Sequence, residues 1–139
     1  MEEHFYISDI DFLQQFKDCK LDPKLFSHEA HLRLAWLMIS NYGKDKASKQ
    51  IQEQLKKFVV FVGARDKYNA TLTVAAVYIT HHFMQKSKSS NFKDFIIEFP
   101  RLKTSFKALI ESHYSFDVFN LETAKAAYLQ PDVLPFDTI

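Results

Sequence analysis

Two helix-length segments are apolar on nearly every side, and they constrain the fold more than any other feature of this chain. Residues 28–42 follow Ser27, a favourable helix N-cap, and end before Gly43, a residue that readily takes the left-handed conformation of helix ends. Residues 70–85 follow Asn69, a second N-cap residue. A helix that is apolar all round must be surrounded by other helices. We therefore predict an all-α, irregular helical bundle with these two helices at its centre.

The other segments predict amphipathic helices that cover this pair. The chain of 139 residues holds only 2 Gly and 4 Pro, which argues against a fold of many strands and loops. We expect about six to seven helices in one domain spanning residues 1–139, and an extended tail from about residue 130, where Pro131 and Pro135 disfavour helix. The covering helices are predicted over residues 9–19, with a stripe of Ile10, Leu13 and Phe16, over 45–62, over 92–99 with Ser90 as cap, around 106–110, and over 120–128 with Asn120 as cap.

Charge and cysteine content limit the classes of binding partner and the cellular compartments that we expect for this protein. The formal net charge is +1, from 18 basic and 17 acidic side chains, so we expect no nucleic acid and no membrane as a partner. The N-terminus is acidic where a signal peptide would be basic, and no apolar run reaches the roughly 18 residues of a membrane span. The single Cys19 cannot form an internal disulfide. A cytoplasmic location is the expectation.

A histidine pair opens the first central helix, in the run Ser-His-Glu-Ala-His-Leu at residues 27–32. His28 and His31 are three residues apart and so share one helix face, where two imidazoles can hold one transition metal together with a carboxylate. Alternatively both imidazoles are structural and bond to nearby backbone. Glu29 is predicted to turn away from His28 and to pair with Arg33.

Hydroxyl and amide side chains cluster at the start of the second central helix, in the run Tyr-Asn-Ala-Thr-Leu-Thr at residues 68–73. Buried hydroxyls must find partners or face a cavity, because leaving one unpaired costs about 1–3 kcal/mol. A polar pocket between the two central helices would satisfy them. In the other interpretation, Thr71 and Thr73 bond to carbonyls one turn back, and Asn69 is only a helix cap.

The two runs together resemble a family of small uncharacterised bacterial helical proteins. In that family a (Trp/Phe)-(Thr/Ser)-His-x-Ala-His-Leu motif precedes a Tyr-His-Glu-Thr-(Leu/Ile)-Thr motif, and the similarity covers most of residues 10–85. The resemblance implies a shared polar site, in which a His and a Glu of the second motif join the two His of the first; here Asn69 and Ala70 stand at those two positions. The matching residues are Phe26, Ser27, His28, His31, Leu32, Tyr68, Thr71 and Thr73.

Three hypotheses for function follow from these residues. The leading one is a protein that binds a small polar or anionic molecule where the two central helices begin, with Arg65 neutralising the anion at the pocket mouth. Its ligand-binding set is His28, His31, Arg65, Tyr68, Asn69, Thr71 and Thr73. The second is an enzyme that uses a divalent metal held by His28, His31 and a carboxylate such as Glu29 or Glu122. The third is a non-catalytic interaction or structural module, for which a homodimer is the simplest form.

Overall fold

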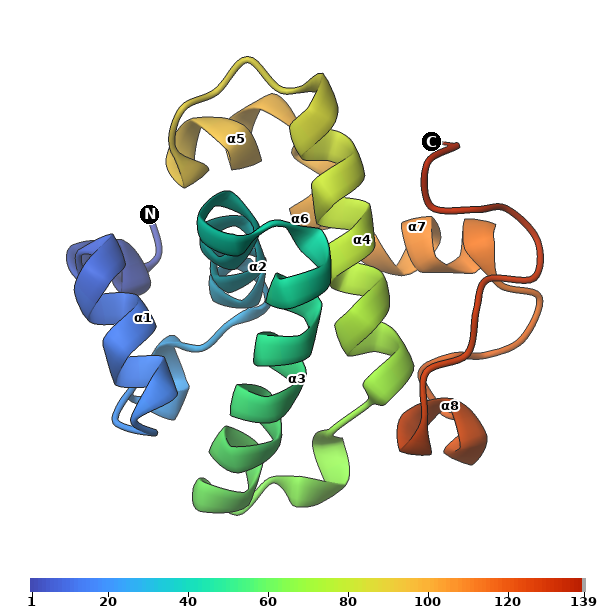
Figure 1. Ribbon diagram of the computed structural model, residues 1–139, viewed down its shortest axis with the longest axis horizontal. Helices are drawn as coiled ribbons and strands as arrows, with labels where there is room; N and C mark the ends of the chain where they lie inside the picture. The colour runs from blue at the N-terminus through green and yellow to red at the C-terminus, as the bar shows by residue number, and fades with distance from the viewer. Residues whose placement is uncertain (139) are drawn as a thin grey trace.

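Three long helices form the centre of the molecule, and the other helices lie around them (Figure 1). The structure is a computed structural model that describes residues 1–138, and it is all-α: eight α-helices and no strand occur among these residues. Helices α2 (His28–Tyr42), α3 (Lys44–Phe61) and α4 (Ala70–Lys86) each pack against the other two. Around them lie α1 (Asp9–Lys17), α5 (Phe92–Glu98), α6 (Arg101–Thr104), α7 (Phe106–His113) and α8 (Glu122–Ala126).

The helix boundaries that matter for the site follow from local capping, as predicted. The Ser27 hydroxyl accepts a hydrogen bond from the Ala30 amide and begins α2. The Asn69 side-chain oxygen accepts from the Leu72 amide and begins α4. Gly43 has φ 81°, in the left-handed region that glycine adopts at little cost, and it separates α2 from α3 without a longer loop.

Helices α2 and α4 are apolar all round because they separate two hydrophobic clusters. One cluster joins α1, α2 and α3, and it includes Phe16, Leu34, Ile51 and, from α4, Val77. The second joins α4 to the C-terminal third of the chain, and it includes Leu32 of α2 with the α4, α5 and α7 residues Ala75, Ile79, Phe83, Phe95 and Ile110. Each central helix therefore has an apolar environment on opposite sides, which confirms the prediction of two buried central helices.

The peripheral helices differ from the sequence-based expectation in detail. The buried face of α1 is formed by Phe12 and Phe16, whereas Ile10 is 80 % exposed. The apolar face predicted for this helix is therefore rotated by part of a turn from the observed one. Helix α5 is capped by Asn91 instead of Ser90, and the Asn120 amide donates to Asp117 instead of capping α8. Short α6, after Pro100, raises the number of helices to eight in the described chain.

Beyond α8 the chain continues without helix from residue 127 to 138. This tail returns to α7, where the Val133 amide donates to the His113 carbonyl at 3.0 Å and His113 Nδ1 lies 2.9 Å from the Leu134 carbonyl. None of the helices in residues 1–138 is both long enough and apolar enough to cross a bilayer.

Candidate functional site

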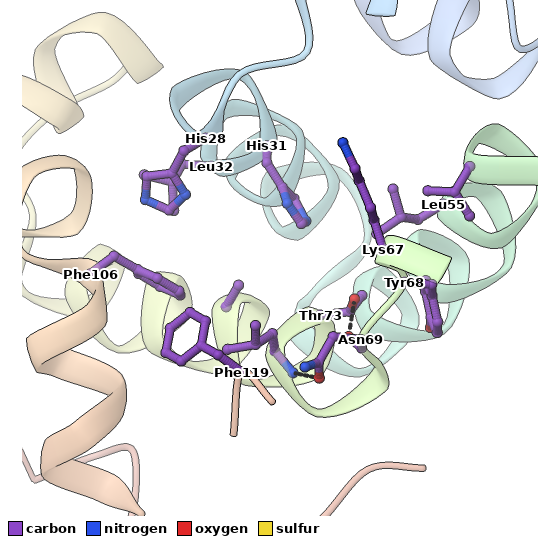
Figure 2. A pocket seen from close by; sticks show the side chains of 13 residues that line it. His28, His31, Leu32, Leu55, Lys67, Tyr68, Asn69, Thr73, Phe106 and Phe119 are labelled. Carbon is purple, nitrogen blue, oxygen red and sulfur yellow. Dashed lines mark hydrogen bonds between the residues drawn. The ribbon is translucent and has the colours of Figure 1, made fainter. Parts of the chain in front are cut away.

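A cavity of about 280 Å³ lies between the first turns of α2 and α4. Figure 2 shows His28 and His31 projecting from α2 on one side of it, Phe106 and Phe119 opposite His28, and Asn69 and Thr73 opposite His31. A pocket therefore lies between the two central helices, but it is mainly apolar and not the polar pocket that was predicted. Its remaining lining residues are Leu32, Leu55, Val59, Lys67, Tyr68, Leu72 and Ala76.

The two histidines have different environments although they share one helix face. His28 Nε2 lies 2.9 Å from the Leu102 carbonyl, and its ring centroid is 4.8 Å from that of Phe106, so this imidazole is anchored to α6 and α7. His31 stacks near Phe26, with ring centroids 5.5 Å apart, and its Nε2 atom is buried without a hydrogen-bond partner among residues 1–138. Burial and the neighbouring His28 lower the pKa of His31 to about 4, so its ring is neutral at pH 7.

Tyr68 supplies a second buried polar atom at the same cavity. Its hydroxyl oxygen has no hydrogen bond of good geometry within the described chain, although the Thr73 hydroxyl lies close enough to influence it. Burial raises the pKa of Tyr68, and the Thr73 hydroxyl offsets part of that rise, so the phenol keeps its proton at neutral pH. The Thr73 hydroxyl itself donates to the Asn69 carbonyl one turn back, at 2.7 Å. Thr73 is thus satisfied by backbone, whereas Tyr68 is not.

Asn69 lines the cavity, but both polar atoms of its side chain already form hydrogen bonds within the fold. Its oxygen caps α4, and its amide nitrogen donates to the Val118 carbonyl at 2.9 Å. The second bond ties the start of α4 to the segment that carries Phe119, one of the cavity walls. Asn69 therefore holds two sides of the cavity together.

Two of the predicted site residues lie elsewhere. The Thr71 hydroxyl donates to the Ala124 carbonyl at 2.7 Å and lies 3.0 Å from the Ala127 carbonyl, so it faces α8 and does not line the cavity. Arg65 does not line the cavity but a more open hollow of about 600 Å³ next to it, which also contains Asp66 and Glu122 and which meets the cavity at Val59 and Tyr68. The cation at the cavity is instead Lys67, an exposed residue that sequence reasoning did not single out.

Neither of the two carboxylates proposed to complete a metal centre lies beside His28 and His31. Glu29, one candidate, lies on another side of α2 with His4 and Lys103, and Glu122, the other, borders the hollow near Arg65. The predicted pairing of Glu29 with Arg33 is also wrong, because Arg33 donates to the N-terminal segment instead. Among residues 1–138, the one group of three potential ligands close enough to share an ion is Glu2, His4 and Glu29.

The sequence did not indicate the group of Glu2, His4 and Glu29, and its hydrogen bonds explain why these three side chains lie together. His4 is 1 % exposed; its Nε2 lies 2.7 Å from Glu29 Oε1, and its Nδ1 lies 3.4 Å from Arg33 Nη1. Because arginine only donates, Nδ1 must be the acceptor and Nε2 must carry the hydrogen that Glu29 accepts. A metal on Nε2 would require a hydrogen on Nδ1, facing the guanidinium. The Lys103 ammonium, 2.8 Å from Glu29 and 3.3 Å from Glu2, balances the two carboxylates. The donor set fits a structural ion-pair cluster and not a metal centre.

Comparison of this chain with protein-family models, with curated proteins and with solved structures finds no match. The resemblance drawn from the two motifs therefore stays a prediction, and the function is argued from the cavity alone.

Proposed function

We propose that this protein binds a small molecule in the cavity between the first turns of α2 and α4. The observation that supports the proposal best is the pair of buried polar atoms at its wall, His31 Nε2 and the Tyr68 hydroxyl, neither of which has a good hydrogen bond within the described chain. A buried polar group left unpaired costs about 1–3 kcal/mol, so two of them at one cavity favour a binding role over a purely structural one.

The cavity has the composition of a small-molecule site. Its walls are mainly apolar, with a few polar side chains among them, of which His31 and Tyr68 hold the two unpaired polar atoms. Taking about 30 Å³ for each non-hydrogen atom, the volume suits a ligand of about ten such atoms. Both polar atoms are covered by neighbouring atoms, so a ligand would reach them through a small rotation of either ring. Such side-chain adjustments are common on binding.

A thermal-shift screen tests the proposal with variants of the same fold. Compounds of about ten non-hydrogen atoms are added at about 100 times their Kd, where binding stabilises by about 2.7 kcal/mol. We expect some to raise the Tm of the wild-type protein, and we expect this rise to be lost in His31→Leu and reduced in Tyr68→Phe. Tyr68→Phe removes only the hydroxyl, and His31→Leu replaces the imidazole, which contacts Phe26, by an apolar side chain of similar size.

Tyr114→Phe is the matched control. The Tyr114 hydroxyl donates to the Leu129 carbonyl at 2.8 Å, and the ring lies away from the cavity, so this variant should lose stability but keep the ligand-induced rise in Tm. The proposal fails if no compound raises the Tm of the wild type, or if His31→Leu and Tyr68→Phe keep the full rise.

A further inference from the structure

The charge around the cavity is of one sign. Among the described residues that line it, Lys67 alone carries a formal charge, and no carboxylate is present. Glu29 of α2 bonds to His4 and Lys103, and Asp66 lines the neighbouring hollow together with Arg65. A neutral or cationic ligand would gain nothing from Lys67, whereas an anion would gain an ion pair at the rim.

The remaining polar groups favour the same charge. Helices α2 and α4, of 15 and 17 residues, both begin at the cavity, and a helix N-terminus carries a partial positive charge. The protonated Tyr68 hydroxyl donates one hydrogen bond, and a neutral imidazole in its Nε2–H form lets His31 donate another. Two donors and a cation, with His31 on one wall of the cavity and Lys67 and Tyr68 on the facing wall, match a group with two acceptor oxygens and one negative charge.

The apolar walls of the cavity determine what kind of body the ligand can have beside its charged group. Phe106 and Phe119 present aromatic rings, and Leu32 and Leu72 add aliphatic surface (Figure 2). A flat apolar body can pack against these walls within about 280 Å³. A phosphate dianion fits less well, because one lysine neutralises only half of its charge and the apolar walls would strip its water.

We infer that the ligand is a monocarboxylate with a compact, flat apolar body, its carboxylate between Lys67, Tyr68 and His31 and its body against Phe106 and Phe119. This inference rests on the proposed function and adds the chemical class of the ligand to it. It also replaces Arg65, the cation expected from the sequence, with Lys67.

Benzoate and benzamide are the probes that separate charge from shape. They have the same ring and the same number of non-hydrogen atoms, but only benzoate is an anion at pH 7. We expect calorimetric or NMR titration to give benzoate a Kd up to about fivefold lower than that of benzamide, which is the contribution of one solvent-exposed ion pair. The difference should disappear in Lys67→Met and in high salt, and it should persist in Lys57→Met, which removes an exposed lysine of α3 away from the cavity.

The outcomes distinguish this inference from the proposed function. Equal Kd values for the two probes, unchanged in Lys67→Met, overturn the carboxylate inference and leave a neutral-ligand site standing. Binding of neither probe, while other compounds of the thermal-shift screen do bind, overturns it as well. If no compound of any charge binds, both the inference and the proposed function are wrong.

Discussion

At the scale of single residues, hydrogen-bond partners decide whether a buried polar side chain stabilises the fold. Thr71 and Thr80 are both fully buried threonines of α4. The Thr71 hydroxyl donates to the Ala124 carbonyl of α8, and it accepts from the Leu129 amide after α8 at 3.1 Å. The Thr80 hydroxyl has no partner among residues 1–138. The same residue type on the same helix therefore makes opposite contributions to stability.

Replacing each of these threonines by valine tests that difference. Thr71→Val leaves the buried Ala124 carbonyl and the Leu129 amide without their partner, so it should lower the free energy of unfolding by about 2 kcal/mol. Thr80→Val removes an unpaired hydroxyl and keeps the shape of the side chain, so it should be neutral or stabilising by up to about 1 kcal/mol. Urea denaturation of both variants gives the values, and equal losses would contradict the hydrogen-bond assignment.

At the scale of elements, the N-terminal segment is held to α2 by a buried arginine. Arg33 is 3 % exposed; it donates to the His4 and Ile7 carbonyls, each at 2.7 Å, and to the Asp9 carboxylate at 2.9 Å. Its guanidinium lies 4.5 Å from the centre of the Phe12 ring. One side chain thus anchors the segment before α1 and the first turn of α1 to the central helices.

Arg33→Met should therefore release the N-terminal segment. The change leaves the His4 and Ile7 carbonyls without their donor, whereas the Asp9 side chain is 60 % exposed and stays in water, so we expect a loss of about 2 kcal/mol in the free energy of unfolding. Amide hydrogen exchange should rise over residues 4–9 more than over α4. Lys107→Met is the control, because Lys107 is 75 % exposed and its 3.9 Å pair with Glu111 contributes little. A loss as small in Arg33→Met as in the control would contradict the anchoring role.

The central helices could be predicted from sequence because their signals are local. Ser27, Gly43 and Asn69 mark helix ends through the bonds and conformations of their own neighbourhood, and the structure has helices α2 and α4 at the predicted places. The contacts of Glu29 could not be predicted, since they depend on residues 25 and 74 positions away, His4 and Lys103. Sequence spacing alone predicted Arg33, four residues further along the helix, as the partner of Glu29.

At the scale of the whole molecule, the candidate site also combines residues that local sequence signals indicate with residues that only long-range packing brings near. His28, His31, Tyr68, Asn69 and Thr73 meet at one cavity because two capped helices begin side by side, as predicted. The sequence did not indicate Lys67, Phe106 and Phe119 as cavity residues, because their approach depends on how the loop before α4 and the chain around α7 pack. It likewise did not show that Thr71 faces α8.

Amide chemical-shift changes, recorded by NMR on the wild-type protein with a compound that raises its Tm, show where that compound binds. Binding in the cavity predicts changes at His28–Leu32 of α2, at residues 67–73, and at Phe106 and Phe119, with little change elsewhere. Changes centred on Arg65 and Glu122 at the open hollow, or no change with any compound, would contradict the account.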